Sequence, residues 1–156
     1  MLYRRHEERK VEVSLASPDQ IDDLAVLFDQ YRVFYRQPSD LEAARRFLQE
    51  RFQNSDSVIF AATDNRHVVG FTQLYPSYSS VAMRRIWILN DLFVEESYRR
   101  KGVAKLLMDA AKSHAEATGV ARITLTTQIS NVPAQKLYES LGYIKDEEFY
   151  HYTLRV

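Results

Sequence analysis

The sequence predicts an α/β fold in which helices cover the faces of one mixed β-sheet. Long amphipathic helical patterns separate some of the apolar, β-rich runs. Other runs are joined only by a short turn signal, Asp64-Asn65-Arg66, which is typical of an antiparallel hairpin. Because parallel strands need long crossovers and antiparallel strands need only turns, a chain with both kinds of connection is expected to build a mixed sheet.

The N-terminal third is expected to hold one strand and two helices. A strand is expected at residues 11–15, a helix at 17–35 and a second helix at 39–52. Ser17-Pro18 supplies an N-cap and a proline at the first helical position, and Ser39–Glu42 is a second capping pattern. Met1–Lys10 mixes both charges without periodicity and is expected to be a solvated lead-in.

The rest of the chain adds six strands and two helices to this pattern. In order, we expect strands at 57–63 and 67–75, a loop at 75–80, a strand at 83–94, a helix from 103 to about 118, a strand at 122–127, a helix at 131–141, and strands at 143–145 and 149–155. Pro76 is expected to end the strand before it, and Gly119 and Gly142 are expected to end the two helices.

Composition narrows the class of protein. A chain of 156 residues is expected to form a single domain, 1–156, and its zero formal net charge argues against nucleic acid or a membrane surface as a partner. There is no cysteine, and the four histidines are scattered, so no metal site is expected. No apolar run reaches the roughly 18 residues of a membrane span. A cytoplasmic enzyme or binding protein is therefore expected.

The most informative stretch runs from Asn90 to Lys105. An apolar strand pattern ends in a cationic loop, a single glycine and the start of an amphipathic helix. The first N–H groups of a helix have no intrahelical partner and carry the positive end of its dipole, so this loop is suited to a phosphorylated ligand. The spacing excludes a P-loop and a dinucleotide fingerprint, because Gly102 is the only glycine between Gly70 and Gly119.

Two motifs in this chain resemble those of the GCN5-related N-acetyltransferases (GNAT). The first, Arg99-x-x-Gly102-x-Ala104, is similar to the family's pyrophosphate loop. The second is Asn131-x-x-Ala134-x-x-x-Tyr138-x-x-x-Gly142-Tyr143. The element order also resembles that fold over almost the whole chain, and the polyamine (spermidine/spermine) and yeast Hpa-type branch is the most similar in its motifs.

The resemblance implies acetyl-CoA as the co-substrate and assigns residues to it. The expected coenzyme-binding residues are Leu92, Phe93, Val94, Arg99, Arg100, Lys101, Gly102, Val103, Ala104, Lys105, Asn131, Ala134 and Tyr138. It also implies that Tyr138 protonates the leaving thiolate. From the pattern alone, Tyr138 is equally a core tyrosine on the helix stripe, Asn131 is an N-cap, and the basic loop is a solvated turn.

Asp91 is the expected proton acceptor or anchor for the substrate ammonium. It interrupts an otherwise apolar strand, and a carboxylate there must be ion-paired, exposed in a crevice or functional. An ion pair with an arginine is the alternative. Asn90 stands where the polyamine branch has a glutamate, which leaves both the identity of the base and the polyamine substrate open.

Four further residues are candidates for the acceptor pocket: Tyr31, Tyr35, Gln73 and Tyr75. Half-buried aromatic side chains of the sheet and helix are the alternative for the tyrosines. We expect an N-acetyltransferase that moves the acetyl group directly to a primary amine, and a coenzyme-binding module with little catalysis as the alternative. A homodimer is expected from the apolar C-terminal strand pattern, Tyr150–Val156.

Overall fold

The computed structural model describes residues 10–156 in two compact units. The first unit ends at Leu125, and the second is Thr126–Val156. Each unit is described by itself below. The expected N-terminal lead-in lies outside the described residues except for Lys10. No helix in residues 10–156 is long and apolar enough to cross a membrane.

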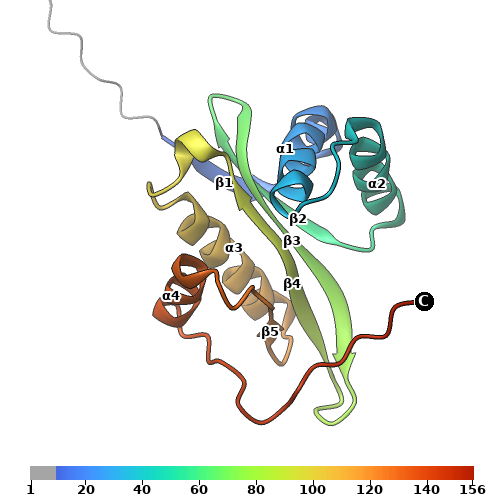
Figure 1. Ribbon diagram of the computed structural model, residues 1–156, viewed down its shortest axis with the longest axis vertical. Coiled ribbons are helices and arrows are strands. Elements are labelled where there is room, and N and C mark those ends of the chain that lie inside the picture. The colour runs from blue at the N-terminus through green and yellow to red at the C-terminus, as the bar shows by residue number, and fades with distance from the viewer. Residues whose placement is uncertain (1–9) are drawn as a thin grey trace, which may run out of the picture. The chain divides into compact units, whose positions relative to one another are not determined.

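The first unit is built on a five-stranded mixed sheet, as predicted (Figure 1). Its strands, in the order in which they lie side by side, are β1 (Glu12–Leu15), β2 (Val58–Asp64), β3 (His67–Ser79), β4 (Arg84–Val94) and β5 (Ile123–Thr124). The first four are antiparallel, whereas β5 runs parallel to β4. Hairpins join β2 to β3 and β3 to β4, and helices make the other connections.

Helices cover both faces of this sheet (Figure 1). A short 3-10 helix, η1 (Pro18–Gln20), leads into α1 (Ile21–Phe34), which packs beside α2 (Leu41–Asn54) on one face, while α3 (Val103–Thr118) lies on the other. The buried face of α1 joins α2 and the sheet in one apolar core, where the rings of Phe28 and Phe47 stack at 5.6 Å. The predicted start of α2 is confirmed, because the Asp40 side chain accepts a hydrogen bond from the Ala43 amide at 3.0 Å.

A glycine allows α3 to lie close to the sheet. A Cβ atom on Gly70 of β3 would lie 3.2 Å from Leu107 Cδ1, 3.2 Å from the Phe93 carbonyl oxygen and 3.3 Å from Val103 Cγ1. These contacts are tighter than ordinary van der Waals packing, so a side chain here would push the first turns of α3 away from β4. Gly70 therefore helps to place the start of α3 beside the end of β4.

The strand β3 is longer than predicted, and the prediction of a loop at residues 75–80 is wrong. The strand continues through Pro76 to Ser79, paired with β4. On its other side β2 begins at Val58, opposite Leu74. Beyond Leu74, β3 is thus an edge strand on that side, where a proline without an N–H group costs no ladder hydrogen bond.

A bulge interrupts the β3–β4 ladder. Gln73 lies opposite Asp91, while the next residue of β3, Leu74, lies opposite Leu89. Asn90 is therefore the extra residue of β4. Bulges bend a strand and redirect its side chains, and they are common beside active sites.

The second unit contains one helix, α4 (Val132–Ser140). The Asn131 side chain caps it by accepting a hydrogen bond from the Ala134 amide at 3.3 Å. Gly142, with φ +90°, ends it in a Schellman motif in which the Tyr143 amide donates to the Tyr138 carbonyl and the Gly142 amide to that of Glu139.

The two final strands expected at 143–145 and 149–155 are not formed within residues 126–156. A strand needs a neighbouring ladder for its main-chain hydrogen bonds, and this unit supplies none. Apolar side chains at alternate positions, including Tyr150, Tyr152 and Leu154, are instead exposed. The prediction of two strands is therefore wrong, because an alternating pattern does not specify the partner that a strand needs.

Candidate active site

Asp91 lies next to the bulge of β4 and is only 4% exposed. Its Oδ2 atom accepts a hydrogen bond from Gln73 Nε2 at 2.7 Å, and its Oδ1 atom accepts one from Asn90 Nδ2 at 3.1 Å. The bulge thus places a carboxylate between two amide donors. One donor comes from the facing strand and the other from the extra residue itself.

No cation neutralises this carboxylate within residues 10–156. Asp91 makes no ion pair there, so the alternative prediction, an ion pair with an arginine, is wrong for these residues. Burial raises the pKa of Asp91, and the hydrogen bonds from Gln73, Tyr31 and Asn90 partly oppose that rise. A buried carboxylate held only by neutral donors can take up a proton or attract a cationic ligand.

Aromatic side chains surround Asp91. The Tyr31 hydroxyl, on α1, donates a hydrogen bond to the Asn90 carbonyl oxygen at 3.4 Å, and its nearness to Asp91 lowers the pKa of that carboxyl group. The Tyr31 ring meets those of Tyr35 and Phe93 edge to face, at 5.1 Å and 5.9 Å. Burial and then the charge of Asp91 raise the pKa of Tyr31, and the same two causes raise the pKa of Tyr75 to about 12. Three of the predicted acceptor residues, Tyr31, Gln73 and Tyr75, therefore interact with one carboxylate, and Tyr35 packs against Tyr31.

The predicted phosphate-binding loop lies at the start of α3. A 3-10 helix, η2 (Glu96–Tyr98), follows β4, and a tight turn leads to Gly102, whose φ of +80° makes it the N-cap of α3. The Arg100 backbone is also left-handed, with φ +61°. No side chain caps this helix. Within residues 10–156, no protein oxygen accepts a hydrogen bond from the main-chain N–H groups of residues 100–105.

These N–H groups form a row of unused donors at the positive end of the α3 dipole. Gly102 has open space around it, since a Cβ atom there would meet nothing within 4 Å. Its φ, rather than crowding by the chain, is what favours glycine. The main chain at this turn is accessible to a bound anion.

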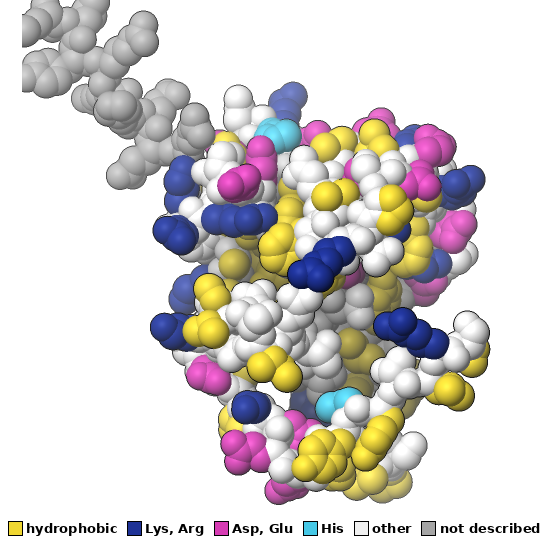
Figure 2. Space-filling model, in the orientation of Figure 1, with side chains coloured by type: hydrophobic (Ala, Val, Ile, Leu, Met, Phe, Trp, Pro, Cys, Tyr) yellow, Lys and Arg dark blue, Asp and Glu magenta, His cyan; other side chains and the backbone are white. Residues whose placement is uncertain are grey.

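The cationic side chains of the loop differ in what they already bind. Arg99 Nε donates to the Val94 carbonyl at 2.9 Å, with its guanidinium 5.1 Å from the centre of the Phe93 ring. Lys101 Nζ donates to the Ser97 carbonyl at 3.0 Å. Lys105 pairs with Asp109 at 2.9 Å. Figure 2 shows Lys and Arg side chains lying over the start of α3 on the face that it draws.

The end of β4 is open on the side away from β3. Within the first unit, β5 pairs only with Trp87 and Ile88, so the stretch Leu89–Val94 has β3 as its only strand neighbour. Main-chain groups along that edge are available to an extended ligand that adds to the strand. Leu92, Phe93 and Val94, predicted to contact the coenzyme, lie along this stretch.

The second unit carries the other predicted site residues, Asn131, Ala134 and Tyr138. The Asn131 side chain and the Ala134 amide form the cap of α4, so Asn131 has the capping role that its pattern predicted. Tyr138 lies in the last turns of α4, with its ring 6.0 Å from that of Tyr143.

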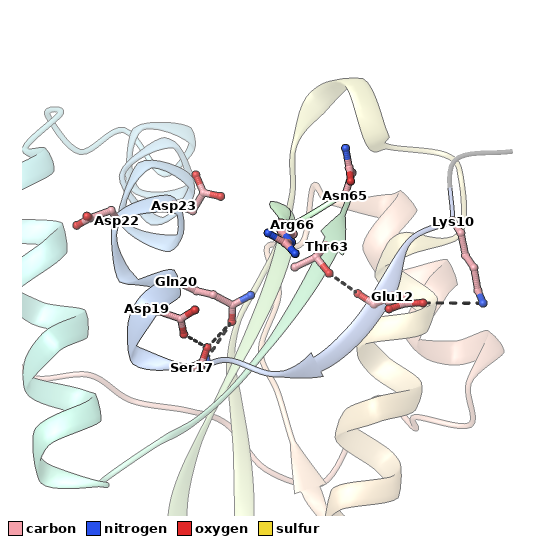
Figure 3. Close-up of a pocket in the computed structure, with 10 residues that line it drawn as sticks. All are labelled: Lys10, Glu12, Ser17, Asp19, Gln20, Asp22, Asp23, Thr63, Asn65 and Arg66. Atoms are coloured by element: carbon pink, nitrogen blue, oxygen red, sulfur yellow. Dashed lines mark hydrogen bonds and ion pairs between the residues drawn. The ribbon is translucent and has the colours of Figure 1, made fainter. Parts of the chain in front are cut away.

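A hollow of about 770 Å³ lies elsewhere on the first unit (Figure 3). Its lining is polar and comes from β1, η1, the start of α1 and the β2–β3 turn, with Asp22 and Asp23 on one side and Arg66 on the other. None of the predicted site residues lines it. We therefore do not assign the chemistry to this hollow.

Comparison with known proteins decides the family. The model of the acetyltransferase (GNAT) family matches residues 23–143. The chain belongs to this family. It is similar to the uncharacterized N-acetyltransferase YhfO of Bacillus subtilis, 51% identical over 133 residues that cover 85% of this chain and 89% of the relative. As an acetyltransferase, it is an enzyme that transfers acyl groups.

Solved structures agree with this assignment. A crystal structure of a probable acetyltransferase superposes with a TM-score of 0.88 at 42% identity, covering 93% of this GNAT chain and 97% of that one. An aminoglycoside N-acetyltransferase in complex with CoA superposes with a TM-score of 0.78 at 21% identity, covering 94% of this chain and 96% of that one. The second likeness shows that the fold is shared.

Two features of the Asp91 site were missed by sequence reasoning. Ser57, at the start of β2, donates from Oγ to Gln73 Oε1 at 2.8 Å, and a lone serine before a strand carries no signal of this. In the sequence, Asn90 is conspicuous only because the polyamine branch has a glutamate at this position. In the structure it is the bulge residue and a hydrogen-bond donor to Asp91. The break in the alternating pattern of β4 at Asn90-Asp91 was the available signal.

Proposed function

We propose that this GNAT protein is an acetyl-CoA-dependent N-acetyltransferase that transfers the acetyl group directly to a primary amine. The observation that carries the proposal is the buried Asp91 carboxylate, without a cation among residues 10–156 and beside Tyr31, Tyr35 and Phe93. A primary ammonium would supply the positively charged partner that this carboxylate lacks, and aromatic faces also attract cations. The family assignment supplies the acyl-transfer reaction.

The coenzyme is proposed to bind along the end of β4 and the start of α3. The N–H groups of residues 101–105 would hold its pyrophosphate, and Arg99, Arg100, Lys101 and Lys105 would surround it with positive charge. The open edge at Leu92–Val94 would hold the extended arm that carries the thioester. The CoA bound by the structural neighbour supports this choice of co-substrate.

Asp91 is proposed to remove the proton that makes the amine inert. An unperturbed primary amine titrates near 10, so at neutral pH almost all of it is ammonium. Transfer of one proton to Asp91, directly or through water, leaves a nitrogen lone pair to attack the thioester carbonyl. The raised pKa of Asp91 brings the base closer to the operating pH.

Tyr138 is proposed to donate the proton that the leaving thiolate needs. Support comes from its place in the motif that begins at Asn131, within the matched residues 23–143. That match also extends over parts of both units, which supports a single functional domain.

We further propose a homodimer, supported by the exposed apolar side chains of Tyr150, Tyr152 and Leu154, and light scattering in solution would test it.

The test is a transfer assay with acetyl-CoA and four acceptors: spermidine, lysine, a lysine-containing peptide and an aminoglycoside. We expect acetylation of at least one of these primary amines, which represent the small-molecule and protein-lysine acceptors. Tyr138→Phe should lower turnover by about 10²-fold or more while leaving acetyl-CoA affinity unchanged, because it removes only the proton donor. Tight acetyl-CoA binding without transfer to any amine would instead favour a coenzyme-binding module.

A further inference from the structure

Gln73 is fully buried beneath Asp91, and both polar atoms of its amide are engaged. Its Nε2 atom donates to Asp91 Oδ2 at 2.7 Å, and its Oε1 atom accepts from Ser57 Oγ at 2.8 Å. An amide that is occupied at both ends and has no exposed surface cannot contact an acceptor molecule directly. Its place in the site must therefore be explained through Asp91.

The orientation of this amide depends on the charge of Asp91. A carboxylate accepts hydrogen bonds and cannot donate them, so the Gln73 NH₂ group faces it and the carbonyl faces Ser57. The reverse orientation would place two acceptor oxygens against each other at short distance. The Ser57 hydroxyl, which can donate or accept, donates to the carbonyl in this orientation.

The two oxygens of Asp91 thus have different surroundings. Oδ2 is held by Gln73, which is fully buried, whereas Oδ1 is held by Asn90, whose side chain is exposed at the bulge. Rotation of the carboxyl group would break the Gln73 bond. Oδ1 is consequently the oxygen that lies next to an exposed residue.

We infer that Gln73, hydrogen-bonded to Ser57, is a positioning residue that holds Asp91 ionised and fixes its Oδ2, which leaves Oδ1 for the incoming amine. The assignment of a reaction to Asp91 rests on the proposed function. The hydrogen-bond chain Ser57–Gln73–Asp91 rests on its two hydrogen bonds alone. Gln73 thereby changes from a predicted substrate-binding residue to a residue that acts through Asp91.

Other titratable or charged groups act on the same carboxylate or its neighbours. Tyr31 of α1 and Tyr75 of β3 both interact with Asp91, and Arg51 of α2 and Asp56, which follows α2, interact with Tyr75. Both tyrosines have pKa values raised above the ordinary 10.0, so they stay neutral through the pH range in which a carboxyl group titrates. A pH effect in that range is therefore assigned to Asp91.

Gln73→Met tests the inference, because it keeps the length of the side chain and removes its donor. Loss of a hydrogen bond to the charged form should raise the Asp91 pKa, so the acidic limb of kcat/KM should move up by about one pH unit. The measurement is the pH profile with acetyl-CoA and the best acceptor of the panel, together with NMR titration of carbonyl-labelled aspartate. Ser57→Ala should shift both readouts in the same direction by less.

Thr72→Val is the matched control. Thr72 is equally buried on the same strand, but its hydroxyl donates to the main-chain carbonyl of Asp91 at 2.8 Å. It should cost stability without moving the Asp91 titration. An unchanged titration in Gln73→Met, or in Ser57→Ala if the first variant does not fold, would overturn the inference.

Failure of the proposed function gives a different result. If Asp91→Asn retained wild-type activity and pH profile, Asp91 would not be the base, yet the NMR shift in Gln73→Met would still support the hydrogen-bond chain. If Asp91→Asn were inactive while Gln73→Met had the wild-type titration, only the role of Gln73 would be refuted.

Discussion

The proposed acceptor side and the proposed coenzyme side of this site use different parts of the polypeptide. Around Asp91 the proposed chemistry belongs to side chains, and Asp91 and Gln73 are buried and joined by a hydrogen bond. At the start of α3 the proposed ligands are main-chain N–H groups with exposed cations around them. A site built from side chains loses its chemistry when one functional group is replaced. A site built from main-chain N–H groups loses its binding only when the backbone changes its conformation. The following substitutions test this difference.

The largest effect is expected from Asp91→Asn. This change keeps the shape of the side chain but removes the proton acceptor, so turnover should fall by about 10²–10⁴-fold. Acetyl-CoA affinity, measured by calorimetry, should stay within about twofold, because the coenzyme site is built from other groups. Asp22→Asn is the control, since Asp22 is an exposed carboxylate that pairs with Arg45 at 2.7 Å. Equal activity losses in the two variants would contradict a special role for Asp91.

A smaller effect is expected from Gly102→Ala, which acts on the backbone. Both Gly102 and Gly119 have a left-handed φ, +80° and +67°, and a Cβ atom on either meets nothing within 4 Å. Substitution at either should lower the free energy of unfolding by roughly 1 kcal/mol. Only Gly102→Ala should also weaken coenzyme binding, by about tenfold, because relief of the strain moves the N–H groups.

Thermal unfolding and calorimetric titration with CoA measure the two quantities separately. The Gly119→Ala variant, altered at the other end of α3, supplies the comparison. The same loss of CoA affinity in both variants would show that helix stability, rather than the position of the loop N–H groups, controls binding.

The smallest effect is expected from a surface cation of the loop. Arg100→Ala should weaken CoA binding by about two- to fivefold, as is typical of exposed charge pairs. Lys112→Ala, in the middle of α3 where Lys112 pairs with Glu116, should have no effect. The difference should shrink between 0.05 M and 1 M salt, since the screening length falls to about 3 Å. An effect of Arg100→Ala that salt does not reduce would argue against an ionic contact.

Local signals predicted most of the elements correctly. The start of α2 at Asp40, the N-cap of α4 at Asn131 and the stop at Gly142 were all readable, because each depends on hydrogen bonds within a few residues. The predictions that were wrong concern strands. Pro76 did not end β3, and the expected strands after Gly142 are not formed in the second unit, since both outcomes depend on which neighbour a strand has.

For the site, the sequence by itself determined the residue types. The sequence shows a carboxylate in an apolar strand and a glycine between a cationic loop and a helix. Both indicate a functional site, because burial and helix geometry limit the roles that such residues can have. Only the tertiary structure decided what each of them contacts. The bulge at Asn90, the absence of a cation beside Asp91 within residues 10–156, and the hydrogen bond from Gln73 all arise from the register between β3 and β4. Register is set by packing between distant segments, and no local pattern encodes it.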